Sequence, residues 1–335
     1  MVIAKRVRTN IGMIMALALA GVMLMGSQVF AETKMNTANT LKVTPVRTDV
    51  TIKPGETKKV QTTVTNLTDA PIVVSPIEND FIAGDEKGTP SLILDAAKFA
   101  PTHSLKRFMT PLKDVTIPAN DSVTIDVVIT VPRDAQAGGY FGAVRFAPAK
   151  PDDGGQVNLS PSIASLILLT VPGDTVQKLN LSNFDIQQNG NIATFFNTPN
   201  DINVSFRFEN KGNVQLAPFG KISVKKSDKV IYDTDFNTEG LRDMVLPDSA
   251  RSWNVPLKDL GGFGHYTAVA TFTYGDKNQT VEAMKSFWIV PKMVVILAIV
   301  GVVVLIALII GTLLYMRGYK QRILNNSGRG KLGRR

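Results

Sequence analysis

The stretch that decides the fold is IPANDSVTIDVVITVPRDAQAGGYFGAVRF, residues 117–146. Every second residue from Val123 to Val131 is apolar, and this period of two predicts a β-strand with one face in a core. A proline and a glycine-rich segment then interrupt the pattern, and a second alternating run follows from Tyr140. The stretch therefore predicts two sheet strands joined by a turn.

The same order of signals occurs twice in the chain. VQTTVTNLTDAPIVVSP at 60–76 corresponds to VSFRFENKGNVQLAPFGKISV at 204–224, because each has a strand pattern, an Asn, a polar turn and a further strand. Residues 117–146 correspond in the same way to LPDSARSWNVPLKDLGGFGHYTAVATF at 246–272. The repeat predicts an all-β fold of two tandem immunoglobulin-like β-sandwiches. We expect them at 40–173 and 175–290, the first with an insertion at 78–113.

The glycines of QAGGYFGAVRF raise the question of a phosphate loop. Such a loop ends at a helix N-terminus, whereas the residues after Tyr140 alternate like a strand. The spacing of Gly138, Gly139 and Gly142 also matches neither the dinucleotide nor the Walker pattern. We expect these glycines to form a tight turn with positive φ, and Tyr140 and its counterpart Tyr266 to bond their hydroxyls to backbone.

Both ends of the chain carry membrane signals. Residues 1–31 have a basic region, an apolar run and small residues before a cleavage site, as in a secretory signal peptide. Residues 293–316 are 24 residues without a charge, which is long enough for a transmembrane helix. Seven cations and no acidic residue follow in the tail 317–335, which predicts a cytoplasmic tail at a bacterial cytoplasmic membrane.

Charge and cysteine content restrict the function further. Without the leader and the tail, 27 basic residues face 28 acidic ones, so the net charge of +9 does not lie on the exported part. Nucleic acid is therefore not an expected partner. The chain has no cysteine, so each sandwich has to be stable without disulfides.

Motifs for catalysis are not found. The two histidines, His103 and His265, fall in different predicted sandwiches, and no HExxH or GxSxG is present. Ser223 begins a serine-x-x-lysine, but it lies in a strand pattern. Asp233 begins a calcium-like run in which Thr238 replaces the glycine of the sharp turn. We predict no catalytic residue, metal or cofactor.

The insertion contains the candidate binding residues. Cations and rings are interleaved there, as a site for an anionic or sugar polymer requires, at Lys98, Phe99, Lys106, Arg107 and Phe108. The alternative is a short amphipathic helix that covers one sandwich, with Leu92, Ile93, Ala96, Ala97 and Phe99 on its buried face.

The run LKVTPVRTDVTIKPGETKKVQTTVTNLTDAPIVV, the VPRDAQAGGYFGAVRF segment and the basic-tailed helix together resemble the WxL-interacting protein family of bacterial surface proteins. The resemblance implies a first domain that binds peptidoglycan and a second that meets host or surface proteins. Thr44-Pro45, PGET and TVTN are also similar to periplasmic pilus chaperones, which pair a free edge strand with their partner.

Two hypotheses follow. The leading one is a non-enzymatic, membrane-anchored surface protein that binds cell-wall polymer (peptidoglycan) or a surface or host protein. The alternative is a chaperone-like or scaffold protein that binds another exported protein by edge-strand addition. The glycines of the span, Gly301 and Gly311, are too far apart for a small-xxx-small motif, so they predict no dimer.

Overall fold

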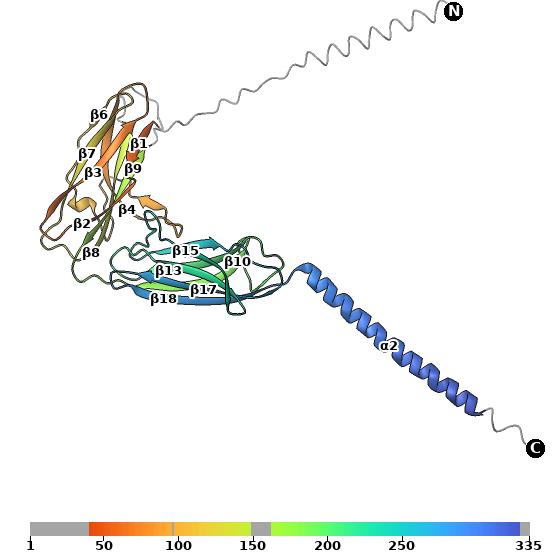
Figure 1. Ribbon diagram of the computed structural model, residues 1–335. Coiled ribbons are helices and arrows are strands. Elements are labelled where there is room, and N and C mark those ends of the chain that lie inside the picture. The colour runs from red at the N-terminus through yellow and green to blue at the C-terminus, as the bar shows by residue number, and fades with distance from the viewer. Residues whose placement is uncertain (1–39, 96, 149–161, 329–335) are drawn as a thin grey trace, which may run out of the picture. The chain divides into compact units, whose positions relative to one another are not determined.

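The computed structural model describes residues 40–95, 97–148 and 162–328. Strands make up most of this part of the chain, and one long apolar helix follows them (Figure 1). The prediction of an all-β fold with a single C-terminal helix is thereby confirmed. The predicted signal peptide at 1–31 lies outside the described residues, and the immunoglobulin class of the two halves stays a prediction.

Strands β1 to β9 form what we call the first sandwich, in which a three-stranded sheet packs on a six-stranded sheet. The strand orders are β1-β3-β7 and β2-β9-β8-β4-β5, with β6 also paired to β4; only β2 and β9 run parallel here. The elements are β1 Leu41–Thr44, β2 Arg47–Thr51, β3 Thr57–Asn66, β4 Ile72–Ala83, β5 Pro90–Leu92, the 3-10 turn η1 Lys106–Phe108, β6 Val115–Ile117, β7 Ser122–Thr130, β8 Gly138–Pro148 and β9 Ile163–Val171.

The core of the first sandwich is built mainly from aliphatic side chains. In β7 the buried residues are every second one from Ile125 to Ile129, as the alternation predicts. Strand β9 has a nearly continuous apolar run instead, because both of its faces are covered. Ile167 and Leu169 face the core, whereas Leu168 belongs to a smaller cluster on the other side of the sheet.

Strands β10 to β18 form the second sandwich, from a four-stranded sheet β11-β10-β13-β16 and a five-stranded sheet β12-β18-β17-β14-β15. All pairs are antiparallel except β12 with β18. The bounds are β10 Leu179–Gln188, β11 Asn191–Ile192, β12 Phe195–Phe196, β13 Ile202–Asn210, β14 Phe219–Lys226, β15 Lys229–Phe236, β16 Ala250–Pro256, β17 Gly264–Tyr274 and β18 Gln279–Ile289.

Aromatic rings dominate the core of the second sandwich. Phe206 in β13 is fully buried, and its ring centroid lies 4.8 Å from that of Phe272 and 5.0 Å from that of Phe236. Trp253 of β16 stacks on the same ring at 5.8 Å. Rings at these separations contribute about 0.5–1.5 kcal/mol per pair beyond their buried area, so the cluster is a main source of stability.

A buried asparagine holds the same turn in both sandwiches. The side-chain amide of Asn66, at the end of β3, donates to the carbonyl of Ala70, and its oxygen accepts the N–H of Thr68. Asn210, at the end of β13, bonds in the same way to the carbonyl four residues on and to the N–H two residues on. The repeat seen in the sequence therefore corresponds to one recurring local structure.

The glycine-rich stretch is a strand rather than the predicted turn. Gly138, Gly139 and Gly142 all lie in β8, and of the three only Gly138 has a positive φ, at 150°. Gly139 and Gly142 are needed for close packing instead. A Cβ at Gly139 would overlap Gln215 Oε1, and one at Gly142 would lie 3.0 Å from the Cβ of Leu105. The predicted turn with positive φ is therefore wrong for these two residues.

The two tyrosines behave as predicted. The hydroxyl of Tyr140 donates to the carbonyl of Gln136 at 2.9 Å, and that of Tyr266 donates to the carbonyl of Gly262 at 3.1 Å. In each case the acceptor lies four residues earlier. Burial raises the pKa of the Tyr140 hydroxyl, so it stays protonated and remains a donor at physiological pH.

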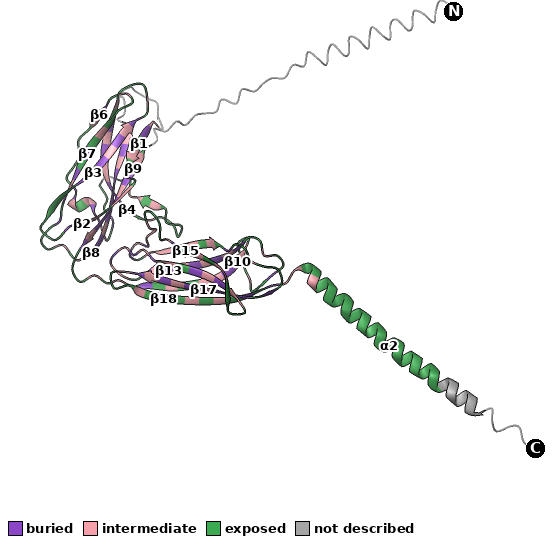
Figure 2. Ribbon diagram, viewed as in Figure 1, coloured by how far each residue is buried: buried purple, intermediate pink, exposed green. Residues whose placement is uncertain are grey.

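Helix α2, Lys292–Gly328, is exposed along its described side chains except at Val294, which is partly buried (Figure 2). Its segment Lys292–Lys320 is 29 residues long and is apolar enough to cross a membrane. The helix continues past Met316, so the first part of the predicted tail, 317–328, is helical. An apolar helix whose described side chains are exposed fits a lipid environment better than water.

Candidate functional site

The predicted amphipathic helix within the insertion is wrong. Residues Pro90–Leu92 form strand β5, which pairs with the end of β4, and the only helical element between β4 and β6 in the described residues is the three-residue turn η1. Ala96, one of the residues expected on the buried face, lies outside the described residues. The insertion is a β-hairpin followed by a loop.

A buried carboxylate explains the course of that loop. Asp80 in β4 has no exposed surface, and it accepts hydrogen bonds from the N–H of Ala100, the hydroxyl of Ser104 and the N–H of Lys106, at 2.8, 2.6 and 2.8 Å. Backbone N–H groups that bond to a side chain are withdrawn from a helical ladder. One carboxylate thus fixes both ends of the segment 100–106.

Three of the five candidate binding residues come together on the loop. Phe99 is 42 % exposed. The Arg107 guanidinium lies 4.4 Å and the Lys106 ammonium 5.1 Å from the centroid of its ring. Lys98 instead forms an ion pair with Asp95 at 3.6 Å. Arg107 and Phe99 form the exposed part of this cation–ring cluster.

Phe108, the fifth candidate, packs on the core of the first sandwich and is not part of the cation–ring cluster. Its ring lies 4.8 Å from that of Tyr140, and both pack on the first core. His103 Nδ1 lies 2.6 Å from the carbonyl oxygen of Gly139. A groove of about 460 Å³ runs between this loop and the start of β8, lined among others by Arg107 and Tyr140.

The tip of the insertion hairpin binds the second sandwich. The Glu86 carboxylate accepts hydrogen bonds from the Arg207 guanidinium, the shortest at 2.8 Å, and from the hydroxyl of Ser252 at 3.0 Å. Its carbonyl also accepts the N–H of Ser252 at 2.7 Å. Arg207 and then Ser252 hold the pKa of Glu86 below its ordinary value. The insertion therefore joins the two sandwiches.

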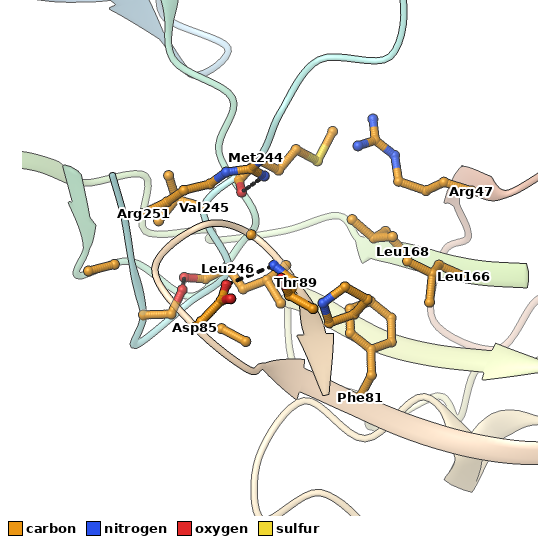
Figure 3. A pocket seen from close by; sticks show the side chains of 15 residues that line it. Arg47, Phe81, Asp85, Thr89, Leu166, Leu168, Met244, Val245, Leu246 and Arg251 are labelled. Atoms are coloured by element: carbon orange, nitrogen blue, oxygen red, sulfur yellow. Dashed lines mark hydrogen bonds between the residues drawn. The ribbon is translucent and has the colours of Figure 1, made fainter. Parts of the chain in front are cut away.

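A cleft lies beneath this contact (Figure 3). Phe81, Leu166 and Leu168 of the first sandwich form one wall, and Met244 and Leu246 of the second form the other. Its volume is about 80 Å³, well below the ~300 Å³ at which small-molecule pockets begin. It is a packed contact with a small gap, and no sequence signal indicated it.

The free edges of the sheets are the remaining place where a partner could bind. Strand β7 is an edge of the three-stranded sheet and has nine residues. Its pairing with β3 runs without a register shift from Thr57 opposite Thr130 to Thr65 opposite Ser122. Hydroxyl pairs order its outer face, at 2.9 Å between Thr63 and Thr124 for example. The result is a long and regular edge.

One hydrogen bond shows which backbone groups of β7 point away from its sheet. The carbonyl of Val128 accepts the N–H of Thr110 at 3.0 Å, from outside the sheet. Pro111 has no N–H and follows directly, so the pairing stops there. Because N–H and C=O groups alternate in direction along a strand, Thr124 and Asp126 also point theirs outward, and these have no partner among the described residues.

Most other edges in the described residues are short, charged, irregular or occupied. Strands β11 and β12 cover only the ends of β10 and β18, but the pairing of β10 has a register shift and β18 carries Glu282 and Lys285. Strands β1, β2, β5, β6, β11 and β12 have five residues or fewer. Strand β16 uses the N–H of Ser252 for the insertion and ends at Pro256. Strand β15 has a register shift in its pairing and carries Lys229, Asp233 and Asp235. Natural proteins protect edges by such shortening, charges and bulges. Strand β7 has one charged residue, Asp126, and no register shift.

The remaining sequence motifs lie in ordinary structure. Ser223 is in β14, and Asp233 in β15 forms an ion pair with Lys221. In the part of the chain that the structure describes, no three His, Cys, Asp or Glu side chains are close enough to hold a metal ion. His103 and His265 belong to different sandwiches.

Comparison with known proteins finds no matching family model and no matching curated protein. Among solved structures, the chain is similar to the chaperone CfaA of class 5 fimbriae, with 15% identity over 73% of this chain and 98% of that one and a TM-score of 0.39. A structure of a chaperone–tip adhesin complex of CFA/I fimbriae biogenesis gives 15% identity, the same coverage and a TM-score of 0.38.

The E. coli chaperone DraB is similar at 14% identity over 75% of this chain and 98% of that one, with a TM-score of 0.33. All of these TM-scores are below 0.5. Likeness at this level carries no conclusion about function, which has to be argued from the residues of this chain.

Proposed function

We propose that this protein is a non-enzymatic, single-pass membrane protein that binds another exported protein by accepting one of its strands on the edge of β7. The observation that carries the proposal is the regular edge of β7, where the outward N–H and C=O groups of Thr124 and Asp126 have no partner among the described residues. The resemblance to the WxL-interacting family belongs to the same proposal, and it implies a surface protein as the partner.

Strand addition needs unpaired N–H and C=O groups in a regular row. Thr124 and Asp126 supply them, and Pro111 keeps the neighbouring loop from pairing there. A partner strand would meet hydroxyls and one carboxylate beside it. Lys59 and then Gln61 hold the pKa of the Asp126 carboxylate below its ordinary value, so this charge is present at neutral pH. We expect the partner strand to carry polar or basic side chains at the facing positions.

Membrane anchorage rests on helix α2. It is long enough to span a bilayer, and the cations that follow it favour a cytoplasmic tail. Both sandwiches would then lie outside a bacterial cytoplasmic membrane, where exported partners pass. The edge of β7 would be available to them without any change in the described structure.

The test is a photo-cross-linking amino acid at position 124 of the full-length protein in its host membrane, with the product identified by mass spectrometry. We expect one exported protein to be linked. In the same chain Asp126→Pro removes an outward N–H and should abolish the product, because a partner strand loses a hydrogen bond and meets the proline ring. Asp126→Ala keeps the N–H and serves as the matched control.

If Asp126→Pro and Asp126→Ala link the partner equally, the edge is not the site and the proposal fails. Circular dichroism of both variants checks that the sheet is intact. Proline is tolerated at an outward position of an edge strand, so both are expected to fold.

The second candidate is a wall polymer in the groove beside the cation–ring cluster. The observation in its favour is the exposed Phe99 with Arg107 against its ring. Co-sedimentation of the full-length protein in detergent with isolated cell-wall sacculi tests it. Pelleting that is lost in Arg107→Ala and at high salt would support this candidate, and pelleting unaffected by Arg107→Ala would exclude the groove as the polymer site.

A further inference from the structure

Three aromatic side chains form a row across the outer face of the five-stranded sheet. Phe195 of β12 pairs with Trp288 of β18, and His265 of β17 pairs with the same Trp288 from the other side. Paired residues of neighbouring strands project from the same face. The rings of His265 and Trp288 lie 4.9 Å apart. Phe263 extends the row, with its ring 6.5 Å from that of Trp288. We call these four residues the aromatic row.

The aromatic row is unusually exposed. Phe195 is 67 %, Phe263 54 % and Trp288 38 % exposed. Among the described residues before helix α2, only one other phenylalanine or tryptophan, Phe99, is exposed to this degree. Large rings on a surface mark a contact with another apolar phase, because leaving them in water is unfavourable.

The aromatic row lies close to the start of helix α2 along the chain. Strand β18 ends at Ile289, and only Val290 and Pro291 separate it from Lys292. The N–H of Val290 donates to the carbonyl of Phe196 at 2.8 Å, and the N–H of Trp288 donates to that of Thr194 at 2.7 Å. The short strand β12 is therefore tied to the chain that enters the helix, and the connection has little freedom.

Chain length limits how far the row can be from a bilayer. Trp288 precedes Met293, the first residue of the charge-free run, by five residues, which span at most about 18 Å when fully extended. The polar headgroup layer on each side of the hydrocarbon core is about 5–8 Å thick. Trp288 can therefore reach this layer, and it lies at most about 10–13 Å beyond it whenever α2 spans a membrane.

We propose that the aromatic row docks the second sandwich on the phospholipid surface, with its rings in the interfacial layer. This inference rests on the proposed membrane anchorage. Tryptophan and phenylalanine are suited to this layer, because their rings are apolar and the indole N–H can bond to headgroups or water. Docking would hold the second sandwich at a set orientation, so that the sheet edge on the first sandwich meets partners at a restricted height above the membrane.

Fluorescence of the full-length protein in phosphatidylcholine–phosphatidylglycerol vesicles tests the proposal. The chain has two tryptophans, Trp253 and Trp288, so Trp253→Phe isolates Trp288. Lipids brominated on the acyl chain near the headgroup should quench Trp288 at least about two-fold, because bromine quenches a ring only on contact and an interfacial ring lies at that depth. Trp288→Phe isolates Trp253, which stacks on Phe206 inside the second sandwich and should not be quenched.

If Trp253→Phe fails to fold, the difference between the native chain and Trp288→Phe gives the same signal. Phe195→Ser and Phe263→Ser should each reduce the quenching of Trp288, because they weaken docking without touching a core. Phe99→Ser removes an exposed ring from the first sandwich and should leave the quenching unchanged.

Flotation of the protein with the vesicles distinguishes a failure of membrane anchorage from a failure of docking. A protein that does not float with the vesicles overturns the membrane anchorage, and docking with it. A protein that floats while Trp288 stays unquenched and fully accessible to aqueous iodide overturns docking and leaves the anchorage intact. Quenching that is unchanged in Phe195→Ser and Phe263→Ser would also contradict a row that docks as a unit.

Discussion

The two sandwiches share their turn structures but differ in their cores. Asn66 and Asn210 hold equivalent turns, and Tyr140 and Tyr266 make equivalent hydroxyl bonds. The first core has one fully packed aromatic ring, Phe146, among aliphatic residues, whereas eight of the buried residues of the second core are aromatic. A core tolerates many side chains of suitable total volume, but a buried polar group needs particular partners. The two sandwiches therefore have the same hydrogen-bonded asparagine and tyrosine at equivalent positions, whereas the apolar residues of their cores differ.

The largest expected effect is the loss of the asparagine in either turn. Asn210→Ala leaves the carbonyl of Val214 and the N–H of Gly212 without this partner, and the carbonyl of Val245 keeps only the N–H of Leu216. The loss should lower the free energy of unfolding by about 3–5 kcal/mol. Asn66→Ala should cost at least as much, because Asn66 donates to three carbonyls. Urea unfolding in detergent, followed by circular dichroism, measures both.

Tryptophan emission tells the two sandwiches apart, because both tryptophans lie in the second one. Asn210→Ala should shift the tryptophan transition to lower urea, and Asn66→Ala should leave it in place while it shifts the dichroism. Equal shifts of the tryptophan transition in both variants would mean that the sandwiches unfold as one unit.

The next effect sharpens the difference between the cores. Phe206→Leu removes a ring that packs against several others and should cost about 2–4 kcal/mol. Phe146→Leu removes a buried ring from an aliphatic core and should cost about 1 kcal/mol, because the volume is nearly kept. The same urea titrations measure both, and equal costs would contradict a stabilising role for the ring cluster.

A smaller effect concerns the two tyrosines. Tyr266→Phe should lower the free energy of unfolding by about 1–2 kcal/mol, because its hydroxyl donates to Gly262 and also accepts from Lys226 within a buried setting. Tyr140→Phe should cost less than about 1 kcal/mol, since its bond to Gln136 is exposed. Thermal unfolding of the two variants against the native protein ranks them, and a larger cost for Tyr140→Phe would reverse the comparison.

The smallest effect concerns the contact between the sandwiches. The pKa of Glu86 is lowered in the folded protein, so its contribution is present above its ordinary value of 4.5 and is lost as pH falls through the folded value. Because the side chain is half exposed, this contribution is below about 1 kcal/mol. Glu86→Gln should remove that part of the pH dependence, measured as the difference between the variant and the native protein from pH 6 to pH 3 by urea titration. If the difference in the free energy of unfolding between Glu86→Gln and the native protein is the same at pH 6 and at pH 3, the ion pair with Arg207 contributes nothing.

The sequence alone was enough for the features that depend on neighbours in the chain. The alternation in β7 and β13, the apolar run of α2, and the repeated asparagine and tyrosine could all be read directly. Each depends on residues two to four positions apart, so the pattern is local. The candidate cluster was partly predictable for the same reason, because Phe99, Lys106 and Arg107 are close in sequence.

Only the tertiary structure decided the rest. The loop of the insertion follows the buried carboxylate of Asp80, which is 20 residues from the N–H of Ala100 and 26 from that of Lys106. Gly139 and Gly142 are needed because side chains from elsewhere in the chain pack closely on β8. The edge of β7 is free because no other strand pairs along it. The aromatic row joins three strands, of which β12 and β18 are far apart in the chain. Such features depend on pairings between distant segments, and residue periodicity carries no information about which segments meet.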